Sequence, residues 1–362
     1  MTHASNAARF QDAIASVEPT DPCAEELAWA RLDSLTKPPR SLGRLEEVAA
    51  VLARIQGTDH PSVQRKIILL MAGDHGVFAE GISVYPQSVT LQMLGNFADG
   101  GAAINQIARS VGASLRVYDV GVVADTSGLS GVRQVKVVES TANMRREPAM
   151  SREQATTAIQ VGIDAALQAV QDGATLLGTG EMGIGNTTAA AALTAAFAGV
   201  EAKRAVGPGT GSGQAGVAHK TIVVQDALAR TEAMQPTDAL DVLASLGGAE
   251  IAALAGVMIG GALAKTAVVV DGFIAGAAAL AAVALCPASR DYLLASHRSK
   301  EPGHTVQLDH LGMSPVLELD MRLGEGTGAA LAMALIDAAC QMISGMATFA
   351  EAGVSVEERA HS

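Results

Sequence analysis

The sequence predicts an α/β protein in which helices cover both faces of a Rossmann-like parallel sheet. Short apolar segments alternate with segments of helical character along most of the 362 residues. The short segments are apolar at consecutive positions, so both faces of each strand are expected to be buried, as in parallel sheets. Aromatic residues make up only 3% of the chain, and 38 residues are glycine. This composition suits close packing of helices on a sheet.

Five short apolar segments predict the strands. Each is too short for a typical helix, and each is followed by a loop rich in Gly, Asp or His. They are expected at 66–73, 114–122, 174–178, 266–272 and 292–297.

Helices are predicted between these strands and at both ends of the chain. The clearest start is Ser151, which forms a capping-box pattern with Gln154. Pro38 and Pro39 interrupt the first helical region, because proline cannot lie inside a helix, and Ser41 is the expected N-cap of the segment that follows. The helical segments are 5–57 with that interruption, 41–55, 87–111 with a break near Gly100, 152–172, 187–198, 216–233, 238–246, 249–263, 273–284 and 326–345.

We expect two domains. Residues 60–325 form a large α/β domain, with the active site at the carboxyl ends of its strands, where ligands bind in open parallel sheets. Residues 1–59 and 326–362 together form a small helical domain.

Charge and composition exclude several classes of protein. The net charge of −12 disfavours nucleic-acid binding, which needs a basic surface. The apolar stretch 251–289 is interrupted by Lys265 and Asp271, so neither part is long enough to span a membrane. Three widely spaced cysteines and an N-terminus without a basic-then-apolar pattern favour a reducing, cytoplasmic location.

The segment GTGEMGIGNTT (178–188) is the strongest local motif. It lies between a predicted strand and a predicted helix, where backbone N–H groups and a helix N-terminus bind anions. A tight turn needed only for packing is the alternative. Residues 178–183 also match GxGxxG, but Glu201 does not end a second strand, so the match to a dinucleotide site is weak. The residues expected at a phosphate and ribose are Gly180, Gly183, Asn186 and Thr187.

Two glutamates lie within glycine-rich segments. Glu325 has glycine on both sides and Leu323 nearby, and an apolar neighbourhood raises a carboxylate's pKa toward that of a general base. A first-turn glutamate stabilised by the helix dipole is the alternative. Glu181 lies inside the anion-binding segment, where it either contacts a hydroxyl or ring nitrogen or is a solvated loop acid.

Lys220 and Asp271 are further candidates. Lys220 follows the cluster VGPGTG (206–211) and could pair with phosphate, although a lone lysine is usually a solvated surface group. Asp271 ends a predicted strand and could bind ribose hydroxyls or form an Asx turn. His75, His297 and the other histidines show no metal-ligand spacing, so no metal site is expected.

Taken together, the motifs resemble those of the nicotinate-nucleotide–dimethylbenzimidazole phosphoribosyltransferases. The matching segments occur in family order along nearly the whole chain. They are KPPRSLGRLE (37–46), AGDHGV with VYPQSVT (72–90), GTGEMGIGNTT (178–188), VGPGTG (206–211), VVDGFIAGAAAL (269–280), SHRSKEPGH (296–304) and LDMRLGEGTGAALA (319–332).

The resemblance implies an activity. The 5-phosphoribosyl group moves from nicotinate mononucleotide to 5,6-dimethylbenzimidazole, and α-ribazole 5′-phosphate and nicotinate are formed. It also implies a homodimer that needs no cofactor. The donor's leaving group already carries positive charge, so one general base acting on the acceptor's N–H is enough.

The resemblance also implies roles for individual residues. Glu325 is the base, Glu181 is the second active-site carboxylate and Lys220 contacts phosphate. The base pocket falls at Tyr85, Gln92, Met93 and Leu323. Relatives often have Ser-Pro where this chain has Tyr85-Pro86, a departure that bears on base selectivity rather than on the reaction.

Three alternatives are considered. An NAD-linked oxidoreductase would use the GxGxxG at 178–183. A non-catalytic nucleotide-binding regulator would not need Glu325. A phosphoribosyltransferase that uses phosphoribosyl pyrophosphate would need an acidic-pair loop, which is not visible in the sequence.

Overall fold

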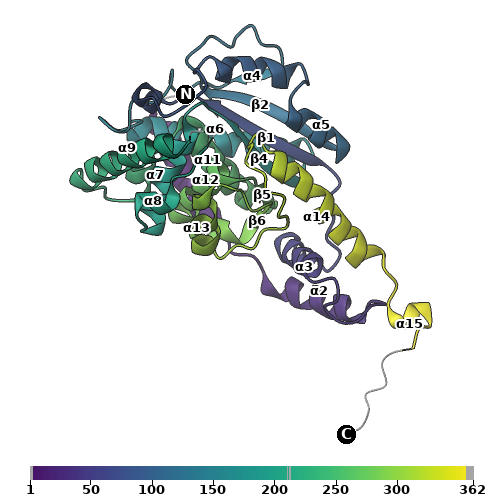
Figure 1. Ribbon diagram of the computed structural model, residues 1–362. Helices are drawn as coiled ribbons and strands as arrows, with labels where there is room; N and C mark the ends of the chain where they lie inside the picture. The colour runs from purple at the N-terminus through teal and green to yellow at the C-terminus, as the bar shows by residue number, and fades with distance from the viewer. Residues whose placement is uncertain (1–2, 210, 212, 356–362) are drawn as a thin grey trace.

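The computed structural model describes residues 3–209, 211 and 213–355. Within them, six parallel strands form one sheet in the order β3-β2-β1-β4-β5-β6 (Figure 1). This is the strand order of doubly wound nucleotide-binding folds, so the predicted fold class is confirmed. The strands are β1 Lys66–Gly73, β2 Ala113–Gly121, β3 Val132–Gln134, β4 Leu176–Met182, β5 Val268–Val270 and β6 Leu293–Ala295.

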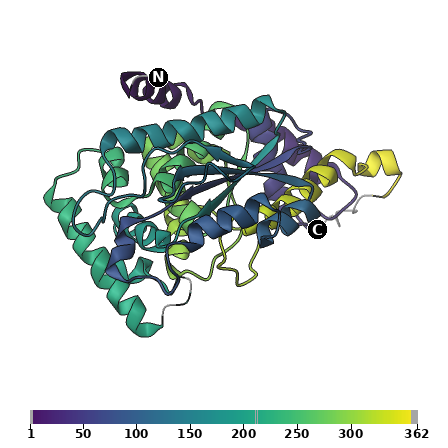
Figure 2. The ribbon, with the colours of Figure 1, turned by 90° about the horizontal axis from the view of Figure 1, so that it is seen from above.

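Helices cover both faces of this sheet (Figure 2). One face is packed by α6 (Arg152–Gln171), α11 (Ala249–Leu263) and α12 (Phe273–Leu285). The other face is packed by α5 (Ala103–Ser110) and α14 (Thr327–Gly345). The strands are buried at every position of β1, β5 and β6, which explains why their sequences are apolar throughout.

The remaining helices complete the cover and the two ends of the chain. They are α1 His3–Ser16, α2 Pro22–Ser34, α3 Arg44–Gln56, η1 Gly76–Glu80, α4 Val89–Ala98, α7 Asn186–Ala198, α8 Ala202–Ala205, α9 Gln214–Ala233, α10 Ala239–Leu246, η2 Pro287–Tyr292, α13 Pro302–Leu311 and α15 Phe349–Ala352.

Only some of the N-terminal helices contact the C-terminal helix α14. Helix α14 packs against α2 and α3, and Leu35 forms an isolated bridge with Thr348. Helix α1 instead packs against α6 and α11, on the helical cover of the sheet (Figure 2). The first half of α14 also contacts the sheet, where Met333 lies against Gly178. The prediction places α1 in the small helical domain, whereas α1 packs on helices of the large one. The division into two domains stays a prediction.

Several predicted boundaries are wrong. The fourth strand in chain order continues to Met182, four residues beyond the predicted end, because Gly178 and Gly180 allow α14 to pack closely against it. Helix α3 begins after Gly43, whose φ is +50°, and not after Ser41. The three-residue strand β3 and helix α13 are not predicted at all, whereas the capping box of Ser151 and Gln154 is confirmed.

One helix of the described residues, α14, is long and apolar enough to cross a membrane. Half of its most apolar window is buried, and it packs against α3, α5 and the sheet, as the core helix of a globular fold does. Helices α11 and α12, from the apolar stretch 251–289, have only 15 and 13 residues.

Candidate active site

A cavity of about 330 Å³ lies beyond the carboxyl ends of β4, β5 and β6. Its walls come from the start of α7, the loops after β5 and β6, the loop before α14 and the segment 85–93 at the start of α4. Ligands bind at this end of parallel sheets. Most of the predicted site residues line it, namely Glu181, Gly183, Asn186, Thr187, Asp271, Tyr85, Met93, Leu323 and Glu325.

Glu325 lies in a loop of three left-handed residues before α14. Gly324, Glu325 and Gly326 have φ of 82°, 62° and 89°. A left-handed conformation is uncommon for a residue other than glycine and is typical of functional sites. A side chain at Gly324 would collide with a Glu181 oxygen, and one at Gly326 would crowd the carbonyl of Thr179. The glycines therefore let this loop lie directly on the end of β4.

Glu325 is 7% exposed, and its carboxyl Oε2 has no hydrogen-bond partner among the described residues. Burial raises its pKa above the usual range, the nearby backbone N–H of Ile104 opposes this, and the charge of Asp271 adds to it. A carboxylate with a raised pKa and an unpaired oxygen at a cavity wall is suited to accept a proton.

Glu181 ends β4 beside this loop. Its Oε2 accepts a hydrogen bond from Nδ2 of Asn186 at 2.5 Å, and its Oε1 accepts one from the backbone N–H of Glu325 at 3.4 Å. Burial raises the pKa of Glu181 to about 8, with further contributions from the charges of Asp271 and Glu250. Burial therefore favours the protonated form of Glu181 at neutral pH, and Oε1 of Glu181 is bonded to the backbone of Glu325.

Asp271 follows β5 and stabilises the start of α14. Its carboxylate accepts hydrogen bonds from the backbone N–H groups of Gly326 and Ala329, at 3.2 and 2.9 Å. This is the arrangement of a helix cap supplied by another strand. Both carboxylate oxygens are thus used to hold the Glu325 loop, and contact with ribose hydroxyls stays a prediction.

The comparisons with known proteins decide the family. A family model described as "Phosphoribosyltransferase" matches residues 17–354. The chain is 50% identical to a nicotinate-nucleotide–dimethylbenzimidazole phosphoribosyltransferase from Chloroflexus aggregans, covering 96% of this chain and 98% of that protein. It is 49% identical to one from Geobacter sulfurreducens, covering 95% and 97%. The crystal structure of CobT from Thermus thermophilus is 50% identical, covers 92% of this chain and 99% of that one, and superimposes with a TM-score of 0.89.

The chain belongs to the nicotinate-nucleotide–dimethylbenzimidazole phosphoribosyltransferase family. It is an enzyme of the pentosyltransferase class, as the resemblance implies. The NAD-linked alternative is not favoured, because Gly178 and Gly180 lie within β4 and face α14 and the loop before it, respectively. Added side chains there would meet Met333 and the carbonyl of Glu325, both at 2.7 Å. In a dinucleotide fingerprint the glycines form the turn after the strand.

Three predicted site residues of this phosphoribosyltransferase lie outside the cavity wall. Gly180 is covered by the backbone of Glu325. Gln92 is exposed, whereas Met93 beside it lines the cavity. Lys220 is 2% exposed, and its Nζ donates to Oγ1 of Thr187 at 3.2 Å and to the carbonyl of Gly207 at 3.5 Å. Lys220 therefore supports the cavity wall from behind.

Sequence reasoning missed four polar residues of the cavity wall: His297, Ser299, Glu301 and Arg322. Glu301 accepts a hydrogen bond from the backbone N–H of Gly209 at 2.9 Å, and Arg322 donates to the carbonyl of Gly209 at 2.9 Å. His297 and Glu301 lie in the segment SHRSKEPGH, and Arg322 lies in LDMRLGEGTG. Both segments carry the family resemblance, which was the available signal.

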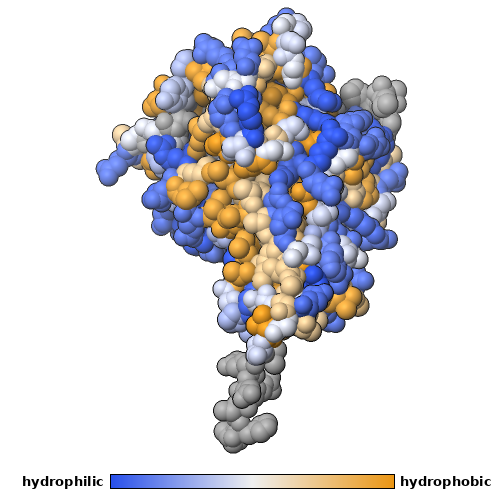
Figure 3. Space-filling model, turned by 90° about the vertical axis from the view of Figure 1, so that its right-hand side faces the viewer, coloured by the Kyte–Doolittle hydropathy of each residue, from blue (hydrophilic) through white to orange (hydrophobic). Residues whose placement is uncertain are grey.

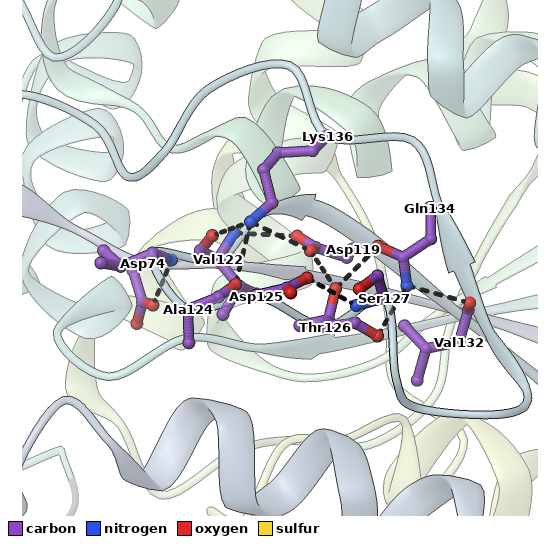
Figure 4. A network of polar contacts seen from close by, with 11 residues as sticks. Asp74, Asp119, Val122, Ala124, Asp125, Thr126, Ser127, Val132, Gln134 and Lys136 are labelled. Carbon is purple, nitrogen blue, oxygen red and sulfur yellow. Dashed lines mark hydrogen bonds and ion pairs between the residues drawn. The ribbon is translucent and has the colours of Figure 1, made fainter.

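A second polar network holds the loop after β2 (Figure 4). The Lys136 ammonium donates to the carbonyls of Val122 and Ala124, at 2.5 and 2.9 Å, and lies 3.5 Å from the buried carboxylate of Asp119. Asp119 also accepts a hydrogen bond from the hydroxyl of Thr126. This network therefore fixes the loop after β2, which lies beside the end of β1.

Proposed function

We propose that this enzyme transfers the 5-phosphoribosyl group of nicotinate mononucleotide to 5,6-dimethylbenzimidazole, giving α-ribazole 5′-phosphate and nicotinate. The relatives at 49–50% identity carry this activity in their names. The observation that carries the proposal in this chain is the buried Glu325 carboxyl, with its unpaired Oε2, at the wall of a largely apolar cavity. Such a cavity is large enough for a small aromatic ligand.

The donor's phosphate is proposed to bind at the N-terminus of α7. Gly183, Asn186 and Thr187 line the cavity there, and a helix N-terminus attracts anions through its free N–H groups and its dipole. Lys220 adds a positive charge behind Thr187, which it contacts directly. No metal or cofactor enters the proposal, because the leaving nicotinate ring already carries positive charge.

The acceptor is proposed to lie against Tyr85, Met93 and Leu323, which supply apolar surface for a dimethylated ring. One ring nitrogen attacks C1′ of the ribose while Glu325 takes the proton from the other nitrogen. The C1′–nicotinate bond breaks in the same step, and its electron pair goes to the ring nitrogen of nicotinate. Attack from the opposite face converts a β-linked donor into an α-linked product. Catalysis then consists largely of holding two rings on opposite sides of C1′.

Glu181 is proposed to position Glu325 rather than to take the proton itself. The hydrogen bond from the Glu325 backbone supports this role, and burial, which raises the pKa of Glu181 to about 8, favours its protonated form at neutral pH. A protonated carboxyl is a poor base but can still hold a loop or a sugar hydroxyl.

The direct test is to incubate the protein with nicotinate mononucleotide and 5,6-dimethylbenzimidazole and to follow the products by chromatography. We expect α-ribazole 5′-phosphate and nicotinate in equal amounts. Tight binding of NADH without formation of either product would contradict the proposal.

A further inference from the structure

One buried hydroxyl connects the two halves of the proposed active site. Thr90, the second residue of α4, is completely buried. Its Oγ1 donates a hydrogen bond to Oδ1 of Asp74 at 2.7 Å and accepts one from the backbone N–H of Ile184 at 3.2 Å. A hydroxyl can do both at once, because it has one proton and two lone pairs.

Thr90 and its partner Ile184 belong to two different walls of the cavity. The acceptor wall consists of Tyr85, Val89 and Met93, and Thr90 lies within this segment. The phosphate loop is 183–187, and Ile184 is part of it. Thr90 Oγ1 is therefore a direct link between the element proposed to hold the aromatic ring and the element proposed to hold the donor.

Asp74 fixes this link to the sheet. Its Oδ2 accepts a hydrogen bond from the backbone N–H of Val123 at 3.0 Å, in the loop that Lys136 also holds (Figure 4). Asp74 follows β1 directly and is 2% exposed. The Thr90 hydroxyl is thus held in one orientation, with its proton toward Asp74 and a lone pair toward Ile184.

Apart from its contact with Thr90, the phosphate loop rests on the end of β1. A side chain at Gly183 would lie 2.1 Å from the carbonyl of Gly73, so this loop packs directly on the end of β1. Beneath it, Nε2 of the buried His75 lies 2.7 Å from Oε1 of the buried Glu250. With a rigid support below, Ile184 N–H and Thr90 transmit the position of one wall to the other.

We propose that Thr90 is a positioning residue that couples binding of the donor to binding of the acceptor. A ligand that shifts one wall also shifts the other through Thr90, so the second ligand binds to a wall already in place. The proposal rests on the proposed function, because it takes the two walls as the donor and acceptor sites.

The test uses a pair of ligands that cannot react. Ribose 5-phosphate carries the donor's sugar and phosphate but no leaving base. The Kd of 5,6-dimethylbenzimidazole is measured by calorimetry with and without saturating ribose 5-phosphate, and the ratio of the two values reports the coupling. We expect a ratio of at least about fivefold for the wild-type enzyme, the lower end of typical coupling between sites.

Thr90→Val keeps the shape of the side chain but removes both hydrogen bonds, and we expect it to bring the ratio close to one. Thr90→Ser keeps the hydroxyl and should keep the ratio. Thr156→Val is the matched control and should also keep the ratio, because Thr156 is buried on α6 and its hydroxyl donates, within the described part of the chain, to the carbonyl of Arg152 alone. Thr90→Ala removes the same bonds without placing a methyl group beside Asp74, and it should also bring the ratio close to one. It replaces Thr90→Val in the test if Thr90→Val does not fold.

A wild-type ratio of one, or a ratio unchanged in both Thr90→Val and Thr90→Ala, would overturn the proposal. A merely structural role would weaken both ligands alike and leave the ratio intact. Failure of the wild-type enzyme to bind either ligand alone would instead count against the proposed function, so the two failures are distinguishable.

Discussion

Glu325 combines two properties that rarely occur in one residue: a left-handed backbone and a buried, partly unpaired carboxyl. The backbone is held by contacts on three sides. Glu181 accepts from its N–H, Gly180 packs against its carbonyl, and Asp271 caps the helix that follows. Strain that several contacts maintain is typical of a group held ready for reaction.

Replacing Glu325 with Gln should leave donor binding intact and lower kcat by about 10²–10⁴-fold, the usual cost of losing a general base. The deficit should shrink as pH rises, because the acceptor then ionises without help from the enzyme. Steady-state kinetics from pH 6 to 9 test this. Glu181→Gln is the companion variant and should lose activity without rescue at high pH. Near wild-type turnover by Glu325→Gln would make Glu181 the leading candidate for the base.

Glu181 should also cost the enzyme stability. Its folded pKa of about 8 lies above the ordinary value of 4.5, so the folded state binds more protons between these values. Stability contributed by the protonated form is present below about pH 4.5 and is lost as pH rises through 8. Glu181→Gln never bears the charge, so its Tm should exceed that of wild type by more at pH 8.5 than at pH 5. A gap independent of pH, measured by calorimetry, would show that this carboxyl is not buried as described.

At the scale of single residues, the sequence predicts which residues lie near the site better than it predicts which way their side chains face. Asp271 and Lys220 were expected as ligand contacts from their positions after a strand and after a glycine cluster. Asp271 is used to cap α14, and Lys220 lies behind Thr187. Which side of a wall a polar group faces depends on tertiary contacts, and the local pattern does not contain them.

At the scale of elements, Lys220 lies behind the start of α7, where the donor's phosphate is proposed to bind. Lys220→Ala removes its positive charge and two hydrogen bonds, so we expect the KM for the donor to rise about tenfold or more, as for loss of a hydrogen bond from a charged group. The fall in kcat should be smaller, because phosphate contact acts equally on the ground state and the transition state. Lys203→Ala, at an exposed lysine paired with Glu201, is the control. A fall in kcat with an unchanged donor KM would reject this role for Lys220.

The elements themselves were predictable where the pattern is long or strongly apolar. β1 is confirmed at its predicted residues, and α11 and α14 are confirmed to within one residue. The end of β4 was not predictable, because a glycine-rich strand has the composition of a loop. Its extension depends on α14, which follows it by more than 140 residues and packs on the glycines. β3 has three residues and lies at the edge of the sheet, so its sequence shows no hydrophobic periodicity.

At the scale of the whole molecule, one face carries a band of apolar residues (Figure 3). This is the side on which α14 lies, and its outer surface includes Leu331, Ala334, Leu335, Ala338 and Met342, all exposed or half-buried. A large exposed apolar area is typical of an interface between subunits. The predicted homodimer would bury this band.

Analytical ultracentrifugation should therefore find a dimer for the wild-type enzyme and a shift toward monomer for Leu335→Glu. Ile222→Glu, at an apolar residue of α9 that is 49% exposed, places the same charge away from α14 and should not change the sedimentation coefficient. A monomeric wild-type enzyme would contradict the prediction.

Removal of metal ions should not affect catalysis. We expect full activity after exhaustive treatment with EDTA, because the leaving group is already charged and one carboxylate is enough to accept the acceptor's proton. The measurement is the initial rate before and after chelation. Activity that is lost and then restored by Mg²⁺ or Zn²⁺ would require a different mechanism.

Helix α14 makes the active site sensitive to a distant part of the molecule. Its first residue follows Glu325 and Gly326, and its far end is held by Arg31, which donates to the carbonyl of Ile343 at 2.6 Å. A rod of 19 residues is roughly 28 Å long at about 1.5 Å per residue. If the far end stayed fixed, a tilt of about 5° would move the first residue of α14 by roughly 2 Å. This is farther than a proton moves between donor and acceptor. The position of the Glu325 carboxylate therefore depends in part on α2, which contacts neither substrate in the proposed reaction.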